Sequence, residues 1–194
     1  MKNIVCHIGM RKTASTSIQA WLSAIDNIDY LGKTRDCGEF ENEAVGYGIE
    51  NLLSHSASLF TEADGRGITC LKERLDLPKS GVYESLVFSN ESFLGPFPFP
   101  HDAKTNLLRL RSVIGKEATV LAFIREQFSF IKSQYGIMVR HGYPGTYKKY
   151  VEELIKHQHS GTLPVLKYAQ LYDMISDIFP KSIILPIEKF LSDE

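Results

Sequence analysis

Cysteine, long apolar runs and an excess of either charge are all scarce in this chain of 194 residues. The three cysteines (Cys6, Cys37 and Cys70) are odd in number and lack metal-ligand spacing, which argues against a disulfide framework or a metal site. No apolar run approaches the roughly 20 residues needed to cross a membrane. The N-terminus also lacks the pattern of a signal peptide. We therefore expect a cytoplasmic protein with reduced thiols, no metal and no membrane span.

The formal net charge of −1 does not indicate extended nucleic-acid binding. The length favours a single domain over residues 1–194. The charges are uneven, because residues 36–64 carry seven acidic side chains and no Lys or Arg, whereas residues 101–150 carry nine Lys or Arg and three acids. The basic half could attract a polyanionic ligand, or the two segments could be oppositely charged solvated faces.

A Gly-Lys-Ser/Thr sequence is also absent from residues 9–18, although Gly-Lys-Thr occurs once elsewhere, at residues 32–34. In Mg-nucleotide loops, that sequence places a lysine and a Mg²⁺-binding hydroxyl at the start of a helix. Residues 12–17 are instead Lys-Thr-Ala-Ser-Thr-Ser, in which the lysine precedes a run of hydroxyls. This loop is better suited to an anion held by protein donors alone than to a Mg-nucleotide.

The segment around this loop predicts a strand, a connection and the start of a helix. Asn3–Ile8 is apolar and β-branched and ends at Gly9. Helical spacing follows at Ile18, Trp21, Leu22 and Ile25. The first N–H groups of a helix are unpaired and its N-terminus carries about half a positive charge, so the connection forms an anion site to which Lys12 adds a full charge. The plainer interpretation is that the hydroxyl residues only cap the helix and the glycine only ends the strand.

Strands and helices alternate along the rest of the chain, which favours an α/β, three-layer, mainly parallel sheet flanked by helices. Further strands are predicted at residues 28–31, 86–88, 119–124 and 182–185. Helices are predicted at residues 41–60, 64–75, 102–114, 128–139, 146–156 and 168–178. Ligands bind beyond the carboxyl ends of parallel strands. Three polar segments follow strands in this way: the loop after Ile8, residues 89–92 and Arg125.

The first loop resembles the 5′-phosphosulfate-binding loop of the PAPS-dependent sulfotransferases, where Lys-Ser/Thr-Gly-Thr-Thr-Ser follows the first strand. Residues 12–17 match it with alanine for glycine and serine for threonine. The resemblance, closest to bacterial and carbohydrate sulfotransferases, implies a P-loop NTPase-like sulfotransferase fold with PAPS as co-substrate and PAP as product. It implies that the nucleotide is held by Arg11, Lys12, Thr13, Ala14, Ser15, Thr16 and Ser17. Alanine adopts φ > 0 only at a steric cost, so this substitution brings into question any φ > 0 conformation that the family's glycine adopts there.

A second motif resembles the 3′-phosphate site of the same family. Arg125 ends an apolar strand, and Ser133 follows eight residues later on the next predicted helix. A forked guanidinium and a hydroxyl can hold a phosphate between them, so the resemblance implies that this pair binds the ribose 3′-phosphate. Taken alone, the spacing also fits a solvated arginine and a surface serine. The resemblance is good over residues 3–25, 84–92 and 118–140.

Sulfuryl transfer builds negative charge on the bridging oxygen of the leaving phosphate, where a cation stabilises the transition state. Lys12 is the candidate for that role, and an in-line transfer needs a base opposite the leaving group. Glu91 is the candidate base, because it follows a strand and precedes the apolar segment 93–100, which could act as a lid. In glycan-modifying sulfotransferases a glutamate after this strand serves as the base, whereas small-molecule members place a histidine nearby, so the resemblance implies a hydroxyl or amine of a carbohydrate-like acceptor. The alternatives are that Glu91 is a loop or capping carboxylate and that segment 93–100 is a packed surface loop.

Two features leave the interpretation open. His7, beside the loop, either contacts the acceptor, orients Lys12 or is a hydrogen-bonded structural histidine. The chain also ends without the basic, glycine-containing loop that closes over the nucleotide in the family, which predicts weak nucleotide binding. Besides a sulfotransferase, the sequence fits a catalytically vestigial PAP- or PAPS-binding protein or a P-loop kinase-like enzyme. Neither the acceptor nor the oligomeric state follows from the sequence.

Overall fold

The computed structural model of the chain describes residues 3–10, 12–32, 65–76, 84–94, 103–157 and 166–192. Within these residues, one parallel sheet has the strand order β2-β3-β1-β4-β5. The strands are β1 (Asn3–His7), β2 (Ile28–Tyr30), β3 (Ser85–Ser89), β4 (Thr119–Ile124) and β5 (Ser182–Pro186). The helices are α1 (Ser15–Ser23), α4 (Gly65–Asp76), α5 (Ala103–Ile114), α6 (Gln127–Arg140), α7 (Tyr147–Lys156), α9 (Tyr168–Ile178) and α10 (Ile187–Ser192), with a 3-10 helix η1 (Glu91–Leu94).

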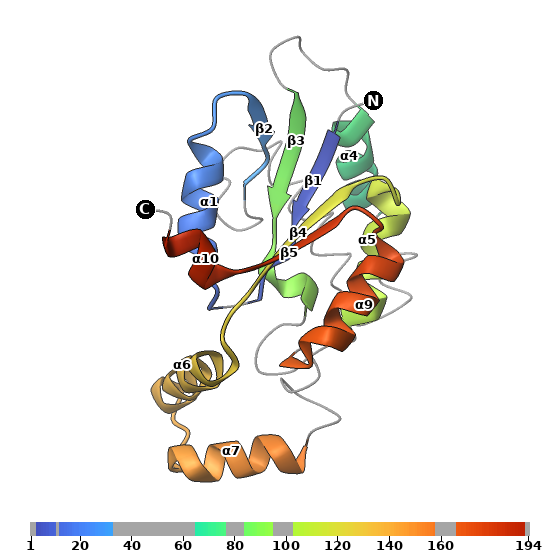
Figure 1. Cartoon of the computed structure of the whole chain (residues 1–194). Helices are drawn as coiled ribbons and strands as arrows, with labels where there is room; N and C mark the ends of the chain where they lie inside the picture. The colour runs from blue at the N-terminus through green and yellow to red at the C-terminus, as the bar shows by residue number, and fades with distance from the viewer. Residues whose placement is uncertain are drawn as a thin grey trace.

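The sheet is the middle of three layers (Figure 1). Helices α1 and α10 cover one face, and α4, α5 and α9 cover the other. The predicted α/β architecture with a parallel sheet is therefore confirmed, and the predicted strands agree with the observed ones to within two residues at either end. The helix predicted over residues 41–60 lies outside the described residues. No helix in the described ranges is long and apolar enough to cross a membrane.

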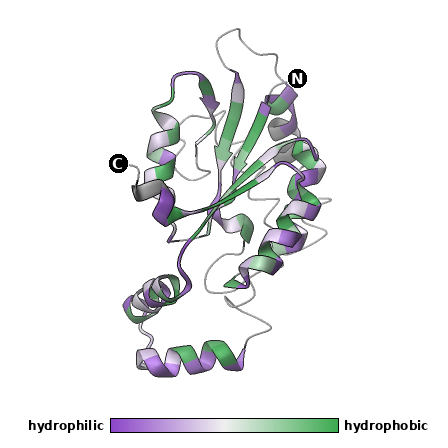
Figure 2. Ribbon diagram, in the orientation of Figure 1, coloured by the Kyte–Doolittle hydropathy of each residue, from purple (hydrophilic) through white to green (hydrophobic). Residues whose placement is uncertain are grey.

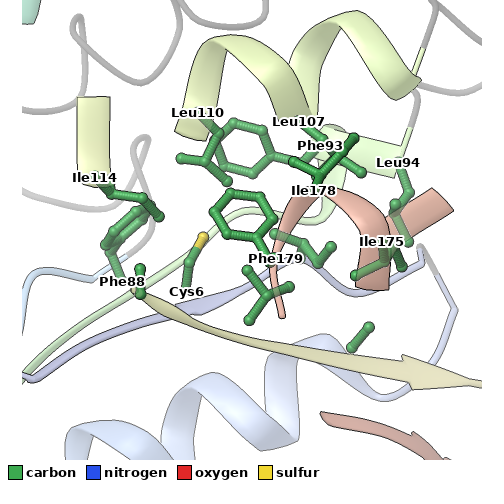
Figure 3. Packing of buried hydrophobic residues seen from close by; sticks show 14 of the residues in the cluster. Cys6, Phe88, Phe93, Leu94, Leu107, Leu110, Ile114, Ile175, Ile178 and Phe179 are labelled. Carbon is green, nitrogen blue, oxygen red and sulfur yellow. The ribbon is translucent and has the colours of Figure 1, made fainter. Parts of the chain in front are cut away.

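Both faces of the sheet are apolar because helices cover both, and successive strand residues alternate between them. The larger core lies between the sheet and α5 and α9, and includes Cys6 and Phe88 from the strands. Figure 3 shows the rings of Phe88, Phe93 and Phe179 gathered in this core. The smaller core lies under α1 and α10 and consists of Ile18, Leu22, Val87, Phe123 and Ile187. Figure 2 shows the matching apolar segments along the central strands.

Two predictions about apolar side chains are wrong. Trp21 is 49% exposed, because the buried stripe of α1 runs through Ile18 and Leu22 and leaves the indole at its edge. Phe93 and Leu94 do not lie in an irregular lid or surface loop, since both belong to η1 and their side chains are buried in the larger core. Residues 95–100 lie outside the described part of the chain.

Helices α6 and α7 lie beyond the carboxyl ends of the strands (Figure 1). Glu126 caps α6, because its carboxylate accepts hydrogen bonds from the N–H groups of Phe128 and Ser129 at 2.8 and 2.7 Å. The helix ends at Arg140 with His141 as its C-cap, and Gly142 follows with φ of 90°, a conformation that glycine adopts at helix ends. The two helices pack through the ring of Tyr135, which contacts the rings of Tyr143, Tyr147 and Tyr150.

Candidate active site

The segments singled out from the sequence meet at one edge of the sheet. Strand β1 is central and pairs with β3 on one side and β4 on the other, with His7 opposite Ser89 and Leu121. All strands are parallel, so the loop after β1, η1 after β3 and Arg125 after β4 leave the same edge. Strands β2 and β3 lie on one side of β1, and β4 and β5 lie on the other, so the direction in which the chain adds strands to the sheet changes at β1. This is the position at which open α/β sheets bind ligands.

The loop after β1 has a backbone shaped to bind an anion. Lys12 and Ala14 both have positive φ, of 69° and 52°, and Thr13 between them does not. Residues of alternating handedness turn successive N–H groups toward one concavity, which binds anions. Ala14 is the N-cap of α1 in the left-handed conformation, so alanine does adopt the φ > 0 that its place in the family motif brought into question. Arg11 lies outside the described residues.

The hydroxyl groups of this loop differ in whether they are available to donate a hydrogen bond to a ligand. Thr13 is buried, and its hydroxyl donates to the carbonyl oxygen of Met10, so it closes the loop rather than facing a ligand. Ser15 is buried, whereas Thr16 and Ser17 are exposed in the first turn of α1. Among the residues that the structure describes, no side chain caps α1. The first amides of this helix are therefore left to a ligand or to solvent.

Arg125 joins the two halves of the site. Its Nη1 donates a hydrogen bond of 3.0 Å to the carbonyl oxygen of Lys12. The hydroxyl of Tyr168 donates to the carbonyl oxygen of Arg125, and burial raises the pKa of Tyr168 to about 12. Ser133 lies half-buried on α6, and no hydrogen bond among the described residues joins it to Arg125. Tyr168 was not predicted as a site residue, since its contact with Arg125 spans 43 residues and leaves no local pattern.

His7 belongs to a buried hydrogen-bonded group under the loop. Its side chain is fully buried, and its Nδ1 lies 2.7 Å from Oγ of Ser89. The same Oγ accepts a hydrogen bond of 3.0 Å from Nε2 of Gln19 on α1. Burial lowers the pKa of His7 to about 4, although the nearby charge of Glu91 acts to raise it. The ring is therefore neutral near pH 7, which agrees with the structural histidine among the alternatives.

Glu91 is the first residue of η1 and is half-buried at the same edge. The backbone before it is tied to β1, because the N–H of Asn90 donates to the carbonyl oxygen of His7 at 2.9 Å. The Asn90 side chain also accepts a hydrogen bond of 2.8 Å from the N–H of Ser92. These contacts position Glu91 within electrostatic reach of His7. Its assignment as a base stays a prediction.

Comparison with known proteins identifies the fold of this chain. No family model matches the chain, and no curated protein matches it. Among solved structures, the chain is similar to a sulfotransferase from Alicyclobacillus acidocaldarius, with a TM-score of 0.58 and 15% sequence identity. The alignment covers 100% of this chain and 76% of that one. The chain therefore has the P-loop-like α/β fold of a sulfotransferase.

Proposed function

We propose that the protein is a sulfotransferase that moves a sulfuryl group from PAPS to a hydroxyl or amine of a carbohydrate-like acceptor. The observation that carries this proposal is the hydrogen bond between Arg125 and Lys12. It joins the loop that resembles the family's 5′-phosphosulfate site to the arginine that resembles its 3′-phosphate site. A nucleotide with phosphates at both positions would meet both groups at one edge of the sheet.

The donor set of the loop suits a phosphosulfate. The backbone N–H groups around Thr13 and the first amides of α1 would bind the 5′-phosphate, together with the hydroxyls of residues 15–17. Lys12 would neutralise the charge that develops on the bridging oxygen as the S–O bond breaks. Arg125 and Ser133 would hold the 3′-phosphate, and Arg11 would add charge to the loop.

Glu91 would act on the acceptor. In an in-line transfer the acceptor oxygen or nitrogen forms a bond to sulfur while the S–O bond to the phosphate breaks, and the electron pair of that bond stays on PAP. The acceptor loses one proton, which Glu91 would accept. Its place on η1, beside the loop after β1, supports this assignment.

Transfer of radiolabelled sulfate from PAPS to a panel of saccharides tests the proposal. We expect transfer by the wild-type protein and its loss in Lys12→Ala and Arg125→Ala. Lys132→Ala is the matched control, because Lys132 is an exposed lysine on α6. PAP binding without turnover on any acceptor would instead indicate a vestigial nucleotide-binding protein. Binding of ATP only with Mg²⁺ would indicate a kinase-like enzyme.

A further inference from the structure

One nitrogen of the buried His7 ring has no hydrogen-bond partner among the described residues. Nδ1 is bonded to Ser89, whereas Nε2 is fully buried and unpaired. Leaving a buried polar atom unsatisfied costs about 1–3 kcal/mol. An atom of this kind in a folded protein is therefore expected to have a partner other than the described residues, such as a water molecule or a ligand.

The hydrogen bonds on the other side of the ring indicate where the proton is. Gln19 can only donate through Nε2, so Oγ of Ser89 accepts from it. The hydroxyl hydrogen of Ser89 is then available to donate to Nδ1 of His7, which lies 2.7 Å away. A neutral ring that accepts at Nδ1 carries its proton on Nε2. The free nitrogen of His7 is therefore a hydrogen-bond donor.

This donor lies against the anion-binding loop. A Cβ built on Gly9 would lie 2.6 Å from Nε2 of His7 and 3.4 Å from Oγ1 of Thr13. The ring is also held edge-on against Phe123, with centroids 5.7 Å apart and planes at 68°. Three neighbours thus fix its orientation: Ser89, Phe123 and Gly9. Nε2 therefore lies beside Gly9, at the start of the loop.

We propose that Nε2–H of His7 is a further binding group of the active site and donates to an oxygen of the 5′-phosphate held by the loop. This inference rests on the proposed function, since it names a donor for the same nucleotide. A neutral donor of this kind needs no desolvation of a second cation beside Lys12. It also explains why glycine occupies position 9, where a side chain would displace the ring.

Two substitutions separate this role from a structural one. Asn places a polar group where Nδ1 of His7 lies and supplies none at Nε2, whereas Gln places an amide donor near Nε2. We expect His7→Asn to weaken PAP binding by about 10- to 100-fold, the range for a hydrogen bond to a charged group. His7→Gln should retain affinity within about threefold of the wild type. Isothermal calorimetry with PAP measures both, and thermal unfolding without PAP shows whether each variant folds.

Ring-nitrogen NMR of the ¹⁵N-labelled wild type gives a second readout, with the His7 signals identified by their loss in His7→Gln. The free protein should show the Nε2–H tautomer, and the Nε2 resonance should move when PAP binds. Equal PAP affinity in His7→Asn and the wild type, or PAP binding with an unchanged Nε2 resonance, would overturn this inference and leave the proposed function standing. Failure of the wild type to bind PAP would overturn both.

Discussion

The guanidinium of Arg125 donates a hydrogen bond from Nη1 to the carbonyl oxygen of Lys12, 3.0 Å away and 113 residues apart in sequence. Lys12 has a φ of 69°, which costs an L-residue about 1–2 kcal/mol. A hydrogen bond from a charged donor contributes about 1.5–3 kcal/mol, enough to hold the residue in this conformation. Arg125 is therefore both a candidate phosphate ligand and the group that sets the shape of the loop.

Replacing Arg125 by lysine tests this double role. Lysine keeps the charge but not the planar fork that can reach a carbonyl and a phosphate at once. We expect Arg125→Lys to lose at least about tenfold in PAP affinity and about 1 kcal/mol in the free energy of unfolding. Calorimetry and urea unfolding measure the two effects. Arg140→Lys, at the exposed end of α6, is the control, and an Arg125→Lys variant indistinguishable from it would contradict the assignment.

Ala14 is predicted to be a strained position. Its φ of 52° is one that glycine adopts without a steric cost. Ala14→Gly should therefore stabilise the protein by about 0.5–1 kcal/mol, after the greater entropy of glycine in the unfolded chain is counted. Urea unfolding of the variant measures this change. Destabilisation by a similar amount would show that the lost methyl contact in the smaller core outweighs the strain.

Gly9→Ala should have the opposite sign. Its new methyl group would lie 2.6 Å from Nε2 of His7, closer than packing allows, so the ring or the loop must move. We expect a loss of about 1–3 kcal/mol. Gly136→Ala on α6 is the matched control, because nothing lies within 4 Å of the added methyl group and alanine favours a helix there by up to about 1 kcal/mol. Equal stability of the two variants would argue against close packing of His7 on Gly9.

The pKa of His7 predicts a loss of stability in mild acid. Burial lowers this pKa from 6.5 to about 4, so between these values the unfolded chain binds a proton that the folded protein does not. Stability therefore falls as the pH falls through this range. From pH 7 to pH 5 we expect the wild type to lose about 2 kcal/mol more than His7→Gln. Urea unfolding at both pH values checks this, with His141→Gln as the exposed control, and parallel pH profiles for wild type and His7→Gln would refute it.

The strands and the order of elements could be predicted because their signals are local. The strand predicted at residues 119–124 has the same bounds as β4. Helix α9 likewise has the bounds predicted from its apolar spacing. The resemblance of residues 12–17 located the loop, and the comparison with a solved sulfotransferase supports the fold. The local sequence pattern was sufficient to predict an element wherever the side chains of a single segment form the face that is buried.

The contacts within the site could not be predicted, because they depend on how distant strands align. His7 meets Ser89 only through the pairing of β1 with β3, 82 residues apart, and Gln19 reaches the same hydroxyl from α1. Phe93 and Leu94 were predicted to lie in a lid or a packed surface loop, because their apolar character does not distinguish a loop from the core. The direction of η1 decides that question.

Thermal unfolding of the wild-type chain with PAP, run beside ATP with Mg²⁺, tests the central claim most directly. A ligand that binds only the folded state, at 100 times its dissociation constant, stabilises by about 2.7 kcal/mol. For a chain of this length that raises the Tm by roughly 5–10 °C. We predict this rise with PAP, its absence with Mg-ATP and its loss in Arg125→Ala. A rise with Mg-ATP alone, or none with PAP, would contradict the account.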